Sequence, residues 1–190
     1  MPQITEIYLP ASAPENESYG QLPPRASFNG NGHFAVRFEI EVWYNSFWRQ
    51  KTVDQIAPSV TSSNILLGFS KSGLGALNIA IENPKMFDAV VIFDAPLMHL
   101  SLPPWNTSDF YTQETWERDL PQNHMESISM LSAQTRIIHI GGRAFHEDHL
   151  AFQALCEDTM ISCEHHHHPE YTHSWTSGWV EEALASALAP

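Results

Sequence analysis

Short runs of hydrophobic residues alternate with segments of helical hydrophobic spacing along most of the chain. Runs of about four to eight apolar residues favour strands, whereas apolar residues three or four positions apart favour helices. The runs predict strands at residues 4–9, 34–40, 65–69, 89–93, 136–140 and 161–166. The helical pattern occurs at residues 42–56, 72–83, 147–159 and 175–188. Such alternation is typical of α/β proteins, so we predict about six mostly parallel strands flanked by helices.

The run at residues 65–69 is continuously apolar, as expected of a central strand that is covered on both faces. It leads directly into Ser70 and then into a predicted helix. Gly68 and Ser72, two residues before and after Ser70, are both small, as a sharp strand-to-helix turn requires. Such a turn presents a serine as a nucleophile. The alternative is a simple loop in which Ser70 and Ser72 cap the helix.

A serine hydroxyl needs a general base within hydrogen-bond reach to act as a nucleophile. His173 follows the last predicted strand and precedes the last predicted helix. In a parallel sheet this position lies at the same edge as Ser70, so we predict that His173 is the base. The backbone N–H of Lys71, in the first turn of the helix, is a candidate oxyanion donor. The alternative for His173 is a packed, hydrogen-bonded histidine.

Three acidic residues are candidates for the group that orients this base. Asp148 and Glu147 follow the fifth predicted strand, and Asp148 gives the chain order serine, acid, histidine. Asp94 stands directly at the tip of the fourth predicted strand, although a turn aspartate there has the alternative role of accepting backbone N–H groups. All three positions lie at the sheet edge where Ser70 emerges, so the choice stays open.

Residues 97–132 break the alternation of strands and helices. Loops this long within a compact domain are usually functional, so we predict an inserted lid or cap, with a long crossover as the alternative. The segment carries the aromatic residues Trp105, Phe110, Tyr111 and Trp116. These either contact an apolar acyl or alcohol group of a substrate or form the core of the lid itself.

Size and composition limit the classes of protein that the chain can belong to. Its 190 residues suffice for one domain with a full core, so we expect a single domain over residues 1–190. With 22 acidic and 9 basic residues the formal net charge is −13, which argues against nucleic-acid binding. No segment approaches the roughly 18 apolar residues that cross a membrane. Cys156 and Cys163 are expected to be thiols in a reducing compartment, so we predict a cytoplasmic protein.

Eleven histidines are an unusual number for this length, and residues 165–168 are all histidine. His146 and His149 are three positions apart, rather than in the His-Glu-x-x-His arrangement of a zinc site. Consecutive histidines on a strand point to opposite faces. We therefore predict no metal site and no cofactor.

Three segments together resemble the α/β-hydrolase superfamily, and within it the small serine esterases. They are the turn around Ser70, the Asn-Pro-x-x-Phe-Asp-Ala-Val-Val segment at 83–91, and the His-Ser-Trp-x-x-Gly-Trp segment at 173–179. The resemblance covers the chain from about residue 4 to its end. The first two of the usual eight strands have no counterpart before residue 4, so it implies a minimal α/β-hydrolase with a lid-like insertion.

The resemblance also implies roles for individual residues. Ser70 would be the nucleophile, His173 the base and the Lys71 N–H one oxyanion donor. The second donor would come from Ala11 or Ser12, because the preceding Pro10 has no N–H. The usual position of the acid, after the fifth strand, is occupied by arginine and alanine at 143–144, which keeps Asp94 open beside Asp148.

Together these features predict a serine hydrolase that acts on a small-molecule ester through an acyl-enzyme on Ser70, with His173 as general base. The alternative is a non-catalytic relative that binds a ligand or a partner in the same crevice. Thioesterases, peptidases and acyltransferases share this machinery, so the pattern leaves the kind of acyl transfer open, as it does the oligomeric state.

Overall fold

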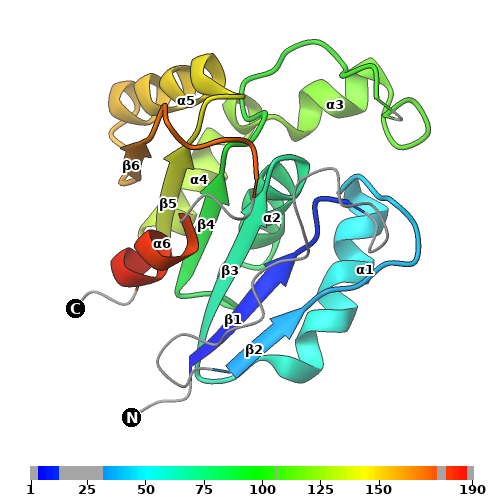
Figure 1. Ribbon diagram of the computed structural model, residues 1–190, viewed down its shortest axis with the longest axis vertical. Coiled ribbons are helices and arrows are strands. Elements are labelled where there is room, and N and C mark those ends of the chain that lie inside the picture. The colour runs from blue at the N-terminus through cyan, green and yellow to red at the C-terminus, as the bar shows by residue number, and fades with distance from the viewer. Residues whose placement is uncertain (1–3, 13–31, 106, 175–178, 188–190) are drawn as a thin grey trace.

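The computed structural model describes residues 4–12, 32–105, 107–174 and 179–187, and six strands form one sheet in it (Figure 1). The strands are β1 (Ile4–Leu9), β2 (Gly32–Ala35), β3 (Ser63–Phe69), β4 (Ala89–Phe93), β5 (Arg136–Gly141) and β6 (Glu164–His167). Their order is β2-β1-β3-β4-β5-β6, and every neighbouring pair is parallel. The predicted α/β class with six strands is confirmed.

Apolar side chains on the inner strands alternate between two cores, one on each face of the sheet. Leu66 and Val90 belong to one core, and their chain neighbours Leu67 and Val91 belong to the other. All four side chains are fully buried. Burial on both faces explains why β3 and β4 read as continuous apolar runs in the sequence.

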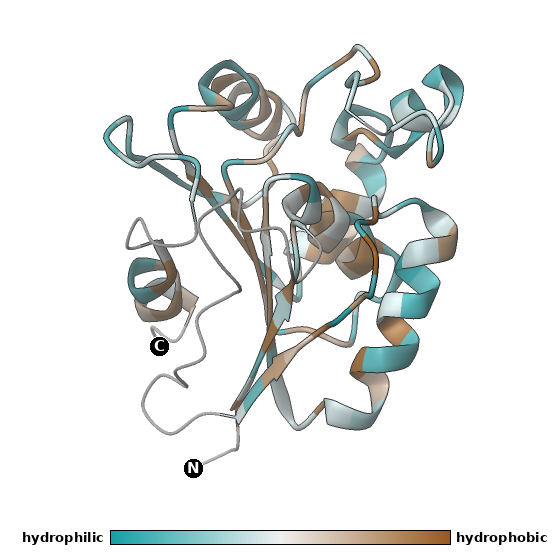
Figure 2. Ribbon diagram, turned by 45° about the vertical axis from the view of Figure 1, so that its right-hand side comes forward, coloured by the Kyte–Doolittle hydropathy of each residue, from teal (hydrophilic) through white to brown (hydrophobic). Residues whose placement is uncertain are grey.

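Six helices flank the sheet in the described part of the chain. They are α1 (Ser46–Ile56), α2 (Lys71–Glu82), α3 (Gln113–Asp119), α4 (Met125–Ser132), α5 (His146–Asp158) and α6 (Trp179–Ala187). Helices α1, α2, α4 and α5 contribute to the core on one face, and α6 packs on the other face (Figure 2). None of these helices is long and apolar enough to cross a bilayer.

Some element boundaries differ from those predicted. The strand expected at 34–40 pairs only over Gly32–Ala35, and the helix expected from 42 begins at Ser46, where the Asn45 side chain accepts the N–H of Trp48. Strand β6 spans Glu164–His167 rather than 161–166, because the Ile161 N–H still bonds to Cys156 O at the end of α5. Of the helix expected at 175–188, residues 175–178 and 188 lie outside the described residues.

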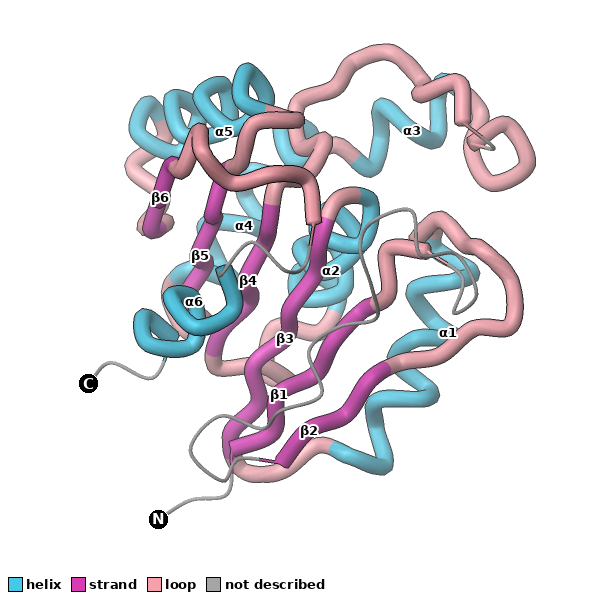
Figure 3. Tube along the Cα trace, viewed as in Figure 1, coloured by secondary structure: helices cyan, strands magenta, loops and turns pink. Residues whose placement is uncertain are grey.

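The segment at 97–132 contains α3, a short 3₁₀ turn at Pro121–Asn123 and α4. A long loop leads from β4 to α3 and passes over the carboxyl ends of the strands (Figure 3). Tyr111 and Trp116 are 4 % and 0 % exposed and belong to the core, whereas Trp105 is 64 % exposed. The aromatic residues of this segment therefore divide between the core and the surface, and its role as a lid stays a prediction.

Candidate active site

Ser70 occupies a strained turn between β3 and α2. Its φ of 55° lies in the left-handed region, which residues other than glycine adopt at a cost. The Ser70 N–H donates to Phe93 O on the neighbouring strand at 2.9 Å, and Ser70 O accepts the Gly73 N–H at 2.8 Å. These bonds fix the turn. A Cβ at Gly68 would lie 2.2 Å from the carbonyl oxygen of Ser72, so this position needs glycine.

Ser72 fills the position at which the motif usually has glycine. Its side chain is fully buried, and its hydroxyl accepts the Phe69 N–H at 2.8 Å. The same hydroxyl lies 3.0 Å from Leu9 O on β1 and 2.8 Å from Phe69 O. Serine is tolerated because its hydroxyl is fully bonded inside the turn. Ser72 therefore joins β1 and β3 to the start of α2.

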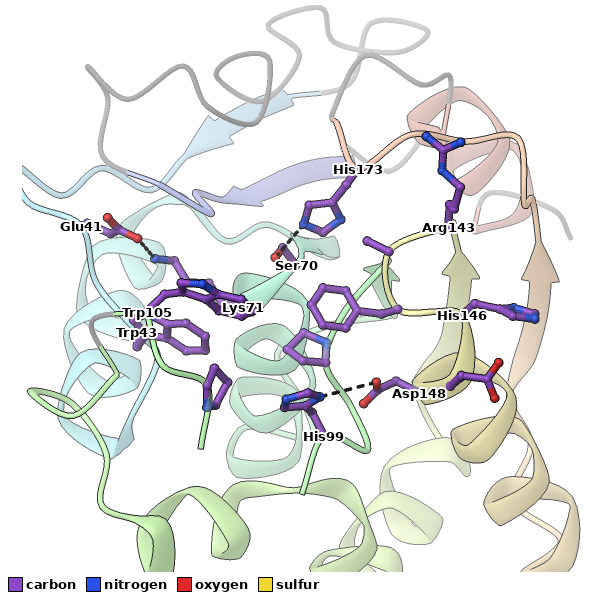
Figure 4. A pocket seen from close by; sticks show the side chains of 15 residues that line it. Glu41, Trp43, Ser70, Lys71, His99, Trp105, Arg143, His146, Asp148 and His173 are labelled. Carbon is purple, nitrogen blue, oxygen red and sulfur yellow. Dashed lines mark hydrogen bonds and ion pairs between the residues drawn. The ribbon is translucent and has the colours of Figure 1, made fainter. Parts of the chain in front are cut away.

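The hydroxyl of Ser70 faces His173 (Figure 4). Ser70 Oγ lies 3.1 Å from His173 Nε2, and His173 Nδ1 lies 2.7 Å from Asp94 Oδ2. A carboxylate oxygen accepts hydrogen bonds, so a proton on His173 Nδ1 donates to Asp94. Nε2 then faces the Ser70 hydroxyl as the acceptor. The rings of Phe69 and Phe145, with centroids 4.5 and 5.5 Å from that of His173, pack beside the imidazole.

Asp94 is fully buried at the end of β4, with a φ of 38°. Its Oδ1 accepts the N–H groups of Gly142 at 3.2 Å and Phe145 at 3.0 Å, and its Oδ2 accepts the Ala144 N–H at 3.3 Å. These donors all belong to the loop between β5 and α5. These bonds hold the Asp94 carboxylate in place directly behind His173.

Asp148 is held elsewhere by a different set of contacts. Helix α5 begins at His146, so Asp148 lies in its first turn, and its Oδ1 accepts the Met98 N–H at 2.7 Å. Its Oδ2 lies 4.0 Å from His99 Nδ1. Burial raises the pKa of Asp148, and the bond from Met98 opposes this shift. Of the candidate acids, the structure brings Asp94 to His173, while Asp148 and Glu147 lie on the pocket wall.

Ser70 and His173 open into a cavity of about 770 Å³. Its walls combine aromatic rings with a few charged groups, from Glu41, Trp43, Lys71, Pro96, His99, Pro103, Trp105, Arg143, Ala144, Phe145, His146, Glu147 and Asp148. Trp43 and Trp105 lie near each other on the wall beside Lys71 (Figure 4). A concave, largely apolar site with a few polar groups is typical of a small-molecule pocket.

Lys71 also places its side chain in this pocket. Its ammonium lies 2.5 Å from Glu41 Oε1 and 5.1 Å from the centre of the Trp43 ring. Burial lowers the pKa of Lys71, and the bond to Glu41 opposes that shift. The sequence pattern pointed only to the backbone of Lys71. Glu41 and Trp43 come from an irregular segment before α1, which carries no motif that could have indicated them.

The predicted oxyanion donors lie at the correct end of the sheet. Lys71 is the first residue of α2, and Ala11 and Ser12 follow β1, whose last residue Leu9 pairs with Gly68 on β3. Helix N-termini carry free N–H groups that favour an anion. Among the described residues, groups of histidine and cysteine close enough to share a metal ion lie around β5, α5 and β6, and none of these residues lines the pocket at Ser70.

A parallel sheet whose central strand runs through a strained serine turn into a helix, with a histidine delivered to the same edge, defines the α/β-hydrolase class. Residues 32–189 match the model of the family described as Putative esterase. The chain therefore belongs to this esterase family and is a hydrolase of ester substrates. Comparison with curated protein sequences gives no significant match.

Solved structures share the fold at low sequence identity. The fluorophosphonate-binding serine hydrolase FphF of Staphylococcus aureus has a TM-score of 0.69 and 13 % identity, over 99 % of this chain and 84 % of its own. An S-formylglutathione hydrolase of Agrobacterium tumefaciens has a TM-score of 0.60 and 18 % identity, over 98 % and 83 %. Est1E of Butyrivibrio proteoclasticus has a TM-score of 0.61 and 13 % identity, over 99 % and 89 %.

Proposed function

We propose that this chain hydrolyses small-molecule carboxylic esters through an acyl-enzyme on Ser70. His173 acts as general base and acid, and Asp94 orients it. The observation that carries the proposal is the continuous chain of hydrogen bonds from Ser70 Oγ through His173 to Asp94, at 3.1 and 2.7 Å. This is the arrangement that converts a weakly nucleophilic hydroxyl into an attacking group.

The reaction proceeds in two halves. Ser70 Oγ attacks the ester carbonyl while His173 Nε2 takes its proton, and the negative charge that develops on the carbonyl oxygen is stabilised by the Lys71 N–H together with an N–H of Ala11 or Ser12. His173 then gives the proton to the departing alcohol, which leaves the acyl group on Ser70. A water molecule attacks the acyl-enzyme while His173 takes its proton, and His173 then returns that proton to Ser70 Oγ as the acid leaves.

The surroundings of Asp94 suit its role in this scheme. Three backbone N–H groups and the His173 ring share its two oxygens, so the carboxylate is held where it orients His173 and faces the positive charge that the ring gains in the reaction. The aromatic wall at Trp43 and Trp105 favours a substrate with an apolar acyl or alcohol group. The cavity has the size that small-molecule ligands occupy.

A fluorophosphonate probe and a series of nitrophenyl esters of increasing acyl length test the proposal. We expect stoichiometric labelling of the wild type, and loss of both labelling and turnover in Ser70→Ala. Ser129→Ala, which changes an exposed serine on α4, is the matched control and is expected to behave as the wild type. If the probe does not label the chain and Ser70→Ala keeps every activity, the proposal is wrong and the chain is instead a non-catalytic binding protein.

A further inference from the structure

Three histidines from three different elements meet beside the sheet. His139 lies on β5, His149 on α5 and His165 on β6, and these elements are neighbours (Figure 1). One ring nitrogen from each lies within 4.8 Å of the others. His139 and His149 are 0 % and 1 % exposed, and His149 Nδ1 lies 3.3 Å from His139 Nε2. The histidines are therefore held close together in a buried place.

Both ring nitrogens of His165 are buried without a hydrogen bond to His139 or His149. The Cys156 thiol is within hydrogen-bond reach of this ring. Buried polar atoms are almost always bonded, because leaving them without a partner costs free energy. His165 can thus supply a third ligand beside the two nitrogens that face each other, His149 Nδ1 and His139 Nε2.

The backbone around the cluster makes room for these rings. His139 and His165 are register partners on adjacent parallel strands, so their side chains project side by side from the same face. A Cβ at Gly141 would lie 2.2 Å from His149 Nδ1, so glycine at this position lets the His149 ring lie over β5. The cluster is thus built by sheet register and a close helix approach.

We propose that His139, His149 and His165 bind one divalent transition-metal ion, with Zn²⁺ as the ion tested first. Zinc binds histidine nitrogens at about 2.0–2.1 Å, and two such nitrogens in a tetrahedral site lie roughly 3.4 Å apart. The 3.3 Å between His149 Nδ1 and His139 Nε2 already matches this spacing. The ion binds outside the ester pocket and does not depend on Ser70.

Bound metal would also tie together the two ends of one short loop. His139 precedes and His149 follows the loop at 142–145, whose N–H groups hold Asp94. A metal shared by β5 and α5 therefore fixes both sides of this loop. We assign the ion a structural role, in which it holds β5, α5 and β6 together.

The prediction of no metal site rested on local spacing, and this cluster does not follow local spacing. Each ligand comes from a separate element, so no two of them form a sequence motif. On β6, neighbouring side chains point to opposite faces, so the side chain of His165 faces away from that of His166, as expected. The register between β5 and β6 places it beside His139 instead.

Zinc titration of the full chain, without an affinity tag and after chelation, tests the proposal by calorimetry and by metal analysis after dialysis. We expect one Zn²⁺ per chain and a higher melting temperature with zinc. His149→Gln should weaken binding by about tenfold or more, since changes around metal sites cost roughly 10- to 100-fold in affinity. Ser70→Ala should bind zinc as the wild type does, which separates this proposal from that for the ester reaction.

Two further variants serve as controls. His166→Ala changes a histidine in the same run whose ring lies 3.1 Å from Glu182, and it should leave zinc affinity unchanged. Cys156→Ser tests the other group of possible ligands, Cys156, Cys163 and His165, and should also leave it unchanged.

Three outcomes would overturn the proposal. In the first, the wild type binds no zinc. In the second, His166→Ala and His149→Gln lose zinc affinity equally. In the third, Cys156→Ser loses zinc affinity and His149→Gln does not. Melting curves without zinc identify any variant that does not fold, and His165→Ala replaces His149→Gln in that case.

Discussion

Replacement of Asp94 by asparagine is the most direct perturbation of the hydrogen-bonded chain at Ser70. Asparagine has nearly the same shape, but it carries one acceptor oxygen and an NH₂ donor. The two backbone bonds that Oδ1 accepts from the loop at 142–145 favour keeping the oxygen there. The NH₂ group then faces His173 Nδ1, which must lose its proton to accept. The proton moves to Nε2, and His173 no longer accepts from Ser70.

The expected loss in kcat is about 10⁴-fold, which is the effect of the wrong histidine tautomer in a Ser-His-Asp triad. At about 1.36 kcal/mol for each factor of ten, this corresponds to about 5 kcal/mol of transition-state stabilisation. The KM should change little, because Asp94 is fully buried behind His173 and does not line the cavity. An effect confined to kcat distinguishes this role from a loss of substrate binding.

Asp148→Asn is the matched control for this experiment. Its side chain bonds to the Met98 N–H, which asparagine can still do through its own oxygen, so activity should stay within a few-fold of the wild type. Steady-state hydrolysis of a nitrophenyl ester gives kcat and KM for both variants, and melting curves establish that they fold. A large loss of kcat in Asp148→Asn, with only a small one in Asp94→Asn, would refute the assignment of the acid.

Three further predictions concern the framework of the site. In Gly68→Ala the added Cβ lies 2.2 Å from a backbone oxygen, so overpacking should cost about 1–3 kcal/mol and lower the melting temperature and the activity together. An unchanged melting curve would contradict this. Arg49→Leu removes the guanidinium that lies 2.5 Å from the buried Asp119, which should lower the free energy of unfolding in urea by about 3–5 kcal/mol. A decrease of less than about 1 kcal/mol would show that Asp119 finds other partners. Burial lowers the pKa of Lys71, so above that pKa the unfolded chain binds more protons than the folded one and folded stability rises with pH. Relative to Lys71→Met, the wild type should therefore gain stability as the pH rises toward about 10.4. A wild type that loses stability relative to Lys71→Met over this pH range would contradict the prediction.

The central part of the fold could be predicted from the sequence because its signals are local. Continuous apolar runs identify strands buried on both faces, and the small residues at 68 and 72 identify the turn at Ser70. The edges were less predictable. Strand β6 consists of one glutamate and three histidines and is only partly buried, so it contains none of the apolar residues of the strand predicted at 161–166. Its position depends on pairing with β5, which the sequence does not encode locally.

The acid could not be chosen from the sequence because the choice depends on tertiary geometry. Asp94 and Asp148 both follow strands at the same edge of the sheet. Chain order favours Asp148, but α5 begins two residues before it and carries its carboxylate to Met98. Asp94 adopts a left-handed φ of 38° directly after β4, and this conformation brings it to His173. No local sequence pattern predicts this conformation.

In the proposed mechanism the acid comes from β4 rather than from the usual position after β5, and the loop between β5 and α5 explains how this is possible. The resemblance to α/β-hydrolases puts the acid in this loop, where Arg143 and Ala144 stand instead. The loop directs three backbone N–H groups toward Asp94, which arrives from the adjacent strand β4. In the usual arrangement this loop carries the acid, whereas here its backbone N–H groups bind the carboxylate of Asp94. In the proposed triad the carboxylate lies between the ends of β4 and β5, 2.7 Å from His173 Nδ1, and this location, rather than the strand that carries the acid, is what allows it to orient the histidine.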